Sequence, residues 1–260
     1  MEHLLEKLDR DPDSHKGENG KVGIIGGSKD FTGAPSLSAK AALRTGCDLA
    51  KILTSEYSRS VVAGFSENFI VDSHPSGYLD ERGMEKAEEL QDWSDCCVIG
   101  PGLGDPDDDT IRQMVSEASK PLIIDAEAIQ PALDAELYDA VFTPHRGEAE
   151  VIRERFTSIQ DFVDEKEVVV VVKGQVDRIY SPEGVEANDT GDPTMTVGGT
   201  GDVLTGIIAS LVSQGLDPEE AARLGCWIDG KAGELASEEY GNGALATDMI
   251  ENIPEVIESN

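Results

Sequence analysis

Short apolar segments rich in valine and isoleucine alternate with amphipathic segments along most of the chain. The apolar segments occupy residues 21–25, 49–54, 96–100, 122–126, 140–143 and 168–172, and helical patterns occupy residues 34–45, 85–92, 109–119 and 148–155. Strands of a parallel sheet are buried on both faces, and a helix usually connects one strand to the next. The alternation therefore predicts an α/β fold of three layers, with a mostly parallel central sheet between two layers of helices.

The last third of the chain adds a hairpin and further helices to this pattern. Residues 181–184 favour a turn, and Ile179 and Tyr180 before it suit an edge strand. Helices are expected at residues 203–211, 218–240 and 246–259, and residues 1–20 are polar enough for a short helix and a loop. No repeat or linker interrupts the chain, so we expect residues 1–260 to form a single domain.

The charge of the chain restricts its partners. It carries 52 acidic and 21 basic residues, for a formal net charge of -31. Nucleic acids and anionic membranes attract basic surfaces, so neither is an expected partner. The acidic residues are spread along the whole chain, as in a surface adapted to high salt, where the Debye length shrinks to about 3 Å at 1 M. We therefore expect a halophilic source.

The cysteines and the N-terminus indicate a reducing compartment. Cys47, Cys96, Cys97 and Cys226 lack the spacing of a metal site or of a disulfide framework. They suit the core of a protein whose thiols stay reduced. No apolar run approaches the roughly 20 residues of a membrane span, and the charged N-terminus does not resemble a signal peptide. We expect a cytoplasmic protein.

Glycine and polar clusters follow the predicted strands. They lie at residues 26–28, 100–104, 125–126, 143–148 and 173–174. In an open parallel sheet, ligands bind beyond the carboxyl ends of the strands, where such clusters meet. Each cluster alone is an ordinary strand-to-helix turn, but together they predict a ligand site at one edge of the sheet.

A further glycine segment, residues 197–206, runs into an apolar helix. Gly199, Thr200 and Gly201 would place backbone N–H groups at the start of that helix, where anions bind. Carboxylates rarely bind phosphate, so Asp202 is a candidate base for a hydroxyl near a phosphoryl group. The alternative is that Asp202 caps the helix, because aspartate is a favoured N-cap residue.

Charged side chains in two of the strand-end clusters can be interpreted as functional or as structural. His145 could bind a substrate and Glu148 could hold a hydrated Mg²⁺ through water, or Glu148 could complement the start of a helix. Lys173 could meet a nucleotide phosphate, or it could be a solvated lysine at the end of a strand.

The motifs at residues 26–35, 100–104, 143–148, 173–174 and 188–206 follow one another in this order. As a set they resemble those of the ADP/ATP-dependent NAD(P)H-hydrate dehydratases, which have a ribokinase-like fold. The resemblance covers nearly the whole chain. Many relatives also carry an NAD(P)H-hydrate epimerase domain, for which this chain has no room, so we expect any epimerase to be a separate partner. Relatives further suggest a homotetramer.

The resemblance implies that the chain restores NADH or NADPH from the hydrated coenzyme, with ADP or ATP as phosphoryl donor and Mg²⁺ as cofactor. Asp202 would be the base, and the N–H groups of Gly199, Thr200 and Gly201 would hold the transferring phosphoryl group. The hydrate would contact Ala34, Gly102, His145 and Asp202. The adenine nucleotide would contact Lys173, Gly174, Gln175, Val176, Asp177 and Gly201.

Two positions depart from the pattern of these relatives. They usually carry threonine where this chain has Asp177, and a carboxylate there would repel nucleotide phosphates unless it points elsewhere. They also tend to read Asn-Pro-Gly-Met where this chain has Asp192-Pro193-Thr194-Met195. Both changes add negative charge near the expected nucleotide site.

Two other functions remain open from the sequence. A small-molecule kinase of the same fold, acting on a thiazole or pyrimidine alcohol such as a vitamin precursor, would share the chemistry of residues 199–202 but release a stable phosphate ester. A nucleotide sensor would bind without turnover. The sequence does not distinguish ADP from ATP, or NADH hydrate from NADPH hydrate.

Overall fold

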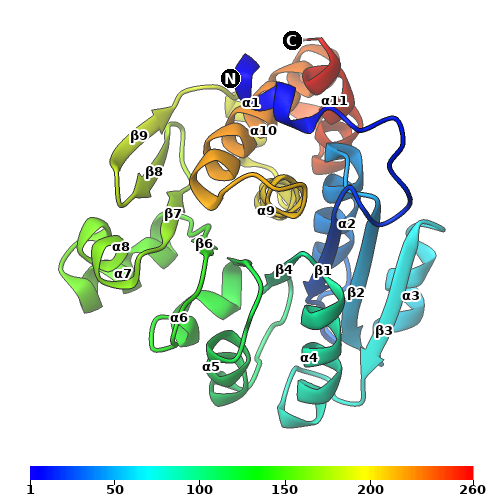
Figure 1. The fold of residues 1–260 in the computed structure, drawn as a ribbon, viewed down its shortest axis with the longest axis vertical. Helices are drawn as coiled ribbons and strands as arrows, with labels where there is room; N and C mark the ends of the chain where they lie inside the picture. Colours follow the sequence, from blue (N-terminus) through cyan, green and yellow to red (C-terminus); the bar gives the residue numbers. More distant parts are fainter. Residues whose placement is uncertain (260) are drawn as a thin grey trace.

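The computed structural model describes residues 1–259, which form one mixed sheet between two layers of helices (Figure 1). The nine strands lie in the order β3-β2-β1-β4-β5-β6-β7-β8-β9. They are β1 (Lys21–Ile25), β2 (Leu49–Ser55), β3 (Phe69–His74), β4 (Cys96–Ile99), β5 (Leu122–Ile124), β6 (Ala140–Phe142), β7 (Val169–Val172), β8 (Asp177–Ser181) and β9 (Gly184–Asn188). Strands β1 to β7 pair in parallel, and the hairpin β8–β9 continues the sheet antiparallel.

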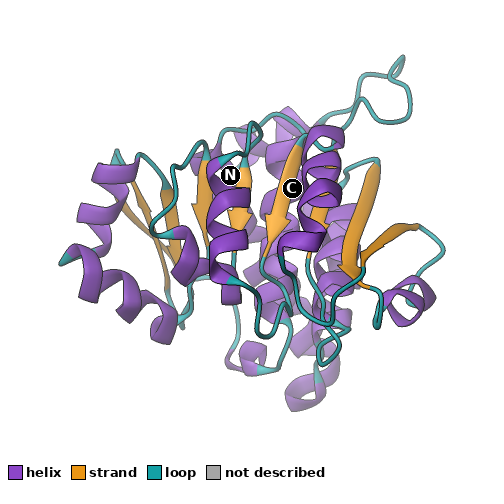
Figure 2. Cartoon of the chain, turned by 90° about the horizontal axis from the view of Figure 1, so that it is seen from below, coloured by secondary structure: helices purple, strands orange, loops and turns teal. Residues whose placement is uncertain are grey.

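Helices cover both faces of the sheet (Figure 2). One face carries α1 (Glu2–Leu5), α2 (Ala34–Thr45), α9 (Thr200–Ser213), α10 (Pro218–Tyr240) and α11 (Ala246–Glu258). The other face carries α4 (Met84–Trp93), α5 (Asp108–Ser116), α6 (Ile129–Ala132), α7 (Arg146–Phe156) and α8 (Ile159–Lys166). Helix α3 (Arg59–Gly64) packs against the edge strand β3. The predicted three-layer α/β fold is confirmed.

Alternate residues of each central strand face opposite cores. In β4, Cys96 and Val98 belong to the core beneath α2, α9 and α10, whereas Cys97 and Ile99 belong to the core beneath α4 and α5. This period of two is the geometry of a strand, and burial on both faces explains why these strands are apolar throughout. All four cysteines are buried and unpaired, as predicted.

Strand β3 and the short helices α3, α6 and α8 escaped the sequence analysis. Strand β3 is half-exposed at the edge of the sheet, so its polar residues hide the strand pattern. Helices α3 and α8 span only 6 and 8 residues, too few for a clear helical period. The predicted hairpin at residues 181–184 and the helix at residues 218–240 are confirmed. Within residues 1–259, no helix is both long and apolar enough to cross a membrane.

Candidate active site

The polar turns after five neighbouring strands meet at one edge of the sheet, as predicted. Strands β1, β4, β5, β6 and β7 are adjacent and parallel, so their carboxyl ends point the same way. Backbone hydrogen bonds join the turns: the Gly27 N–H donates to the Pro101 carbonyl at 2.8 Å, and the Lys173 N–H donates to the Pro144 carbonyl at 2.9 Å. His145 and Lys173 form an isolated parallel bridge that continues the pairing of β6 with β7.

Glycine lets these turns approach one another closely. Gly100 has φ +134°, and a Cβ there would lie 1.8 Å from the Asp125 carbonyl oxygen, so no other residue fits. At Gly102, a Cβ would lie 3.2 Å from the Cβ of Ala34. The structure thus brings together Ala34 and Gly102, two of the expected substrate contacts, from turns far apart in the sequence.

Asp202 lies inside helix α9, not at its cap. The N-cap of α9 is Gly199, with φ 99°, and Asp202 is in the first turn. The capping alternative for Asp202 is therefore wrong, because its backbone is already helical. The first N–H groups of a helix have no partner within the helix, so the turn from Thr200 presents donors and partial positive charge beside the Asp202 carboxyl.

A buried ion pair connects strands β5 and β7 to this helix. Lys173 Nζ lies 2.8 Å from Asp125 Oδ1, and Thr205 Oγ1 of α9 donates to Asp125 Oδ2 at 3.2 Å. A Cβ at Gly201 would lie 3.0 Å from Lys173 Nζ, so the ammonium sits against the first turn of α9. The solvated-lysine alternative for Lys173 is wrong: its side chain is 20% exposed and paired.

Electrostatics around this pair raise the pKa of Asp202. Burial, followed by the Asp125 carboxylate, raises this pKa to about 7, and the Lys173 ammonium opposes the shift. Burial alone would lower the pKa of Lys173, but the Asp125 carboxylate outweighs it and the pKa of Lys173 is raised. A carboxyl group with a pKa near 7 can accept a proton and release it at neutral pH, which is what general base catalysis requires.

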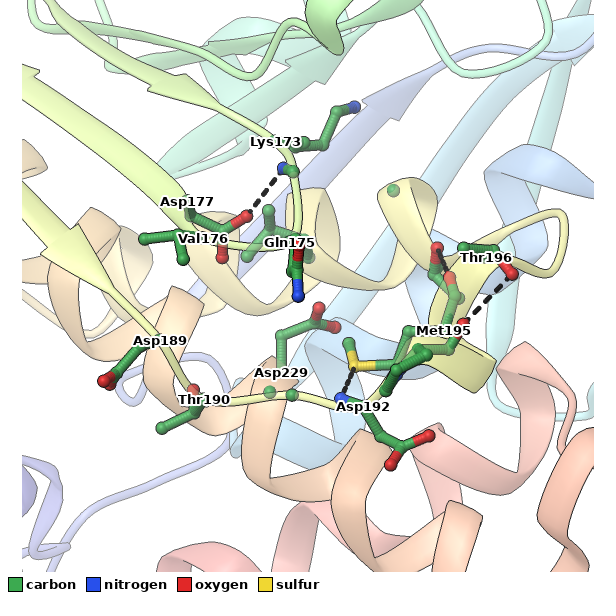
Figure 3. A pocket seen from close by; sticks show the side chains of 17 residues that line it. Lys173, Gln175, Val176, Asp177, Asp189, Thr190, Asp192, Met195, Thr196 and Asp229 are labelled. Atoms are coloured by element: carbon green, nitrogen blue, oxygen red, sulfur yellow. Dashed lines mark hydrogen bonds between the residues drawn. The ribbon is translucent and has the colours of Figure 1, made fainter.

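A cavity of about 740 Å³ opens beside the start of α9 (Figure 3). Its walls come from the turn between β7 and β8, the loop after β9, and helices α9 and α10. The lining residues are Lys173, Gly174, Gln175, Val176, Asp177, Asp189, Thr190, Gly191, Asp192, Pro193, Met195, Thr196, Thr200, Gly201, Leu204, Asp229 and Gly230. The cavity therefore brings together the expected nucleotide residues 173–177, 200 and 201, while Gly199 lies outside the lining.

Asp177 is turned toward its own chain. Its Oδ1 accepts from the Gly174 N–H at 3.0 Å, and its Oδ2 accepts from Asn188 Nδ2 at 3.1 Å. Burial raises the pKa of this carboxyl, and the two hydrogen bonds oppose that shift. The carboxylate closes the β7–β8 turn through these two hydrogen bonds and is directed toward its own chain.

His145 and Glu148 cap helix α7 together. His145 Nδ1 accepts from the Glu148 N–H at 3.1 Å, and Glu148 Oε2 accepts from the His145 N–H at 2.7 Å. This capping box gives Glu148 the helix-start role that the sequence left open. The His145 side chain is 62% exposed, and its Nε2 lies 3.4 Å from Glu148 Oε1.

The carboxyl groups of the site suit Mg²⁺ only as a partner of phosphates. No cluster of three His, Cys, Asp or Glu side chains fit to hold a metal occurs within residues 1–259. Mg²⁺ commonly keeps several waters and binds one or two carboxylates together with substrate phosphates. Asp202, beside the start of α9, fits that mode of binding, whereas Glu148 lines a separate cavity with Gly104 and Glu127.

The sequence analysis missed two residues of this region. Asp125 was recognised as part of a strand-end cluster, but its ion pair with Lys173 depends on the order of strands β5 to β7. Asp229 lies on α10 and is 7% exposed. An aspartate between Ile228 and Gly230 on the apolar face of a helix is unusual, and this was the one signal that could have identified it.

Comparison with known proteins agrees with this geometry. The chain is 41% identical to the ADP-dependent (S)-NAD(P)H-hydrate dehydratase of Haloterrigena turkmenica over 92% of this chain and 93% of that protein. It is 41% identical to the protein of the same name from Natrialba magadii over 99% and 98% of the two chains. The crystal structure of the ADP/ATP-dependent NAD(P)H-hydrate dehydratase from Bacillus subtilis, co-crystallised with ATP and Mg²⁺, is 28% identical and superposes with a TM-score of 0.81 over 99% of this chain and 96% of that one.

A sequence profile supports the same assignment. The profile described as NAD(P)H-hydrate dehydratase matches residues 22–255, which include every strand of the sheet except the first residue of β1, and all the helices that form the site. The chain belongs to the NAD(P)H-hydrate dehydratase family.

Proposed function

We propose that this chain dehydrates the (S) form of hydrated NADH or NADPH, with ADP or ATP as phosphoryl donor. The names of the haloarchaeal relatives support the reaction and the choice of ADP. The observation that carries the proposal is the Asp202 carboxyl, with a pKa of about 7, beside the open start of α9 and the Lys173 ammonium. Hydroxide is a poor leaving group and phosphate a good one, so phosphorylation of the ring hydroxyl prepares its elimination.

The proposed reaction has two balanced steps. Asp202 takes the proton of the ring hydroxyl, whose oxygen attacks the terminal phosphorus of the nucleotide and displaces the shorter nucleotide. In the second step, the bond between ring carbon and oxygen breaks and phosphate leaves with the bonding electrons. The neighbouring ring carbon gives its proton to solvent water, and the electrons of that C–H bond form the double bond that restores the reduced nicotinamide. The N–H groups at Gly199 to Gly201 and the Lys173 ammonium stabilise charge on the transferring group.

Two binding regions follow from this assignment. Lys173 to Asp177, Thr200 and Gly201 would hold the nucleotide in the 740 Å³ cavity, with its phosphates toward Lys173. Ala34, Gly102 and the exposed side of His145 would hold the hydrated ring across the rim from that cavity. Mg²⁺ would neutralise the nucleotide phosphates, and Glu148 would contact it through water.

The proposal is tested by recovery of absorbance at the NADH wavelength. Purified protein is incubated in molar KCl with NADH hydrate or NADPH hydrate and with ADP or ATP in separate reactions. We expect recovery with one equivalent of phosphate released per coenzyme restored. Phosphate transfer to a vitamin-precursor alcohol without recovery would favour the kinase alternative, and nucleotide binding without any turnover would favour a sensor.

We further propose that the protein is a cytoplasmic enzyme of a halophile and that it works as a homotetramer. A separate epimerase would supply its hydrated substrate. Haloarchaeal relatives and the net charge of -31 support adaptation to salt. The midpoint temperature of thermal unfolding should therefore rise with the KCl concentration, since salt screens the repulsion among acidic side chains. Maximal stability at low salt would contradict this part of the proposal.

A further inference from the structure

Asp229 is a buried carboxyl group at the wall of the large cavity, without a role in the proposed chemistry. Its side chain rises from α10 toward the end of Gln175 (Figure 3). The residue is 7% exposed, and its Oδ1 atom is buried without a hydrogen-bond partner among residues 1–259. A buried acceptor that lacks a partner costs free energy, so such a group is normally retained for a function.

The polarity of the cavity determines which part of a nucleotide reaches Asp229. The Lys173 ammonium and the start of α9 mark one end as the place for phosphates. Asp189, Asp192 and Asp229 line the wall formed by α10 and the loop after β9, and the Asp229 carboxyl points toward Gln175 (Figure 3). Phosphates are repelled from that wall, so the uncharged nucleoside must lie against it.

The groups around Asp229 also restrict what it can bind. Burial, followed by the nearby Asp177, raises its pKa well above the usual value, and Lys173 opposes that shift. Whether protonated or not, the carboxyl keeps an oxygen that accepts a hydrogen bond. A nucleoside offers it two kinds of donor, the ribose hydroxyls and the exocyclic amine of adenine.

We propose that Asp229 determines nucleotide specificity, because its carboxyl group, which has an oxygen without a partner, accepts a hydrogen bond from a ribose hydroxyl or the base amine of the bound adenine nucleotide. The contact is made on binding and leaves the phosphoryl chemistry at Asp202 untouched. This inference rests on the proposed function, since it requires that a nucleotide occupies the cavity.

Calorimetric titration with no hydrate present tests the contact, because no turnover then occurs. Wild type and Asp229→Ala are titrated with ADP, 2′-deoxy-ADP, 3′-deoxy-ADP and the diphosphate of purine riboside, which lacks the base amine. We expect wild type to bind one of these analogues about 5- to 30-fold more weakly than ADP. Asp229→Ala should bind that analogue and ADP within about twofold of each other, which also identifies the donor.

Three further variants make the test specific. Asp229→Asn keeps a side-chain acceptor and should keep the preference for ADP, whereas Asp229→Leu fills the same space without an acceptor and should lose it even if the alanine variant does not fold. Glu238→Ala, on an exposed turn of α10, should behave as wild type. If wild type, Asp229→Ala and Asp229→Leu all show the same difference in affinity between ADP and the analogue, the inference is overturned and the proposed function is not. Failure of wild type to bind ADP or ATP would overturn the proposed function with it.

Discussion

Two half-buried carboxyl groups beside the same cavity, Asp202 and Asp177, differ in the hydrogen bonds that they accept. Asp177 accepts two hydrogen bonds and ties the β7–β8 turn to Asn188. The Asp202 carboxyl makes no hydrogen bond within residues 1–259. Burial and the Asp125 carboxylate raise its pKa, and the Lys173 ammonium opposes that shift. The same residue type therefore stabilises the fold at one place and remains free to exchange a proton at the other.

The largest effect should come from Asp202→Asn. The amide cannot accept the hydroxyl proton, so turnover should fall by about 10²- to 10⁴-fold, while the nucleotide affinity stays within a few-fold of wild type. Steady-state recovery of NADH absorbance and calorimetric titration with ADP measure the two quantities. Turnover equal to wild type would remove Asp202 as the base.

The Lys173 ammonium interacts with both Asp125 and Asp202, so its replacement should reduce both the stability of the fold and the rate of turnover. Lys173→Met leaves Asp125 buried without its partner, which should lower the free energy of unfolding by about 3–5 kcal/mol. It should also raise the pKa of Asp202. Asp125→Asn should act in the opposite direction on that pKa, because a carboxylate that disfavours ionised Asp202 is lost. Profiles of kcat/KM against pH should show the acidic limb moving up for Lys173→Met and down for Asp125→Asn.

The stability of the protein should report the raised pKa of Asp202. The unfolded carboxyl has a pKa of about 3.9, below the folded value of about 7, so the folded state binds more protons between these values. The contribution of Asp202 to stability should therefore fall by about 2–4 kcal/mol as pH rises from 4 to 7. Urea unfolding at several pH values should show a shallower decline for Asp202→Asn than for wild type; parallel curves would contradict the assigned shift.

The smallest effect on turnover should come from Asp177→Ala. Loss of its two hydrogen bonds should lower the free energy of unfolding by about 1–3 kcal/mol and loosen the β7–β8 turn. The KM for ADP should then rise while kcat stays within about threefold. A loss of kcat as large as that of Asp202→Asn would show that the two carboxyl groups do not differ as the structure indicates.

The sequence predicts the features that depend on local patterns, and it does not predict those that depend on contacts between distant segments. Strand ends such as Asp125 and Lys173 were placed at one edge of the sheet because local patterns define strands, and parallel strands align their ends. Their ion pair depends on β5, β6 and β7 being neighbours, which no local pattern specifies. The first turn of α9 was placed correctly as a helix start, but the distinction between a cap and a helical Asp202 depends on the backbone angles of Gly199.

The same limit applies to the residues that depart from the family pattern. Asp177 was expected to threaten phosphate binding, because the sequence shows its charge and not its partners. Only the folded hairpin reveals that the Gly174 N–H and Asn188 Nδ2 donate hydrogen bonds to its carboxylate.

The adjacent thiols of β4 can report how each of the two layers of helices opens. Cys96 and Cys97 face opposite cores, and burial raises the pKa of both, so neither reacts with an alkylating reagent while its layer is closed. The rates at which Cys96 and Cys97 are alkylated, measured by mass spectrometry, would therefore give the opening rate of each layer of helices separately. Equal rates would mean that the two faces of the sheet come apart in one event, and unequal rates would reveal which layer detaches first.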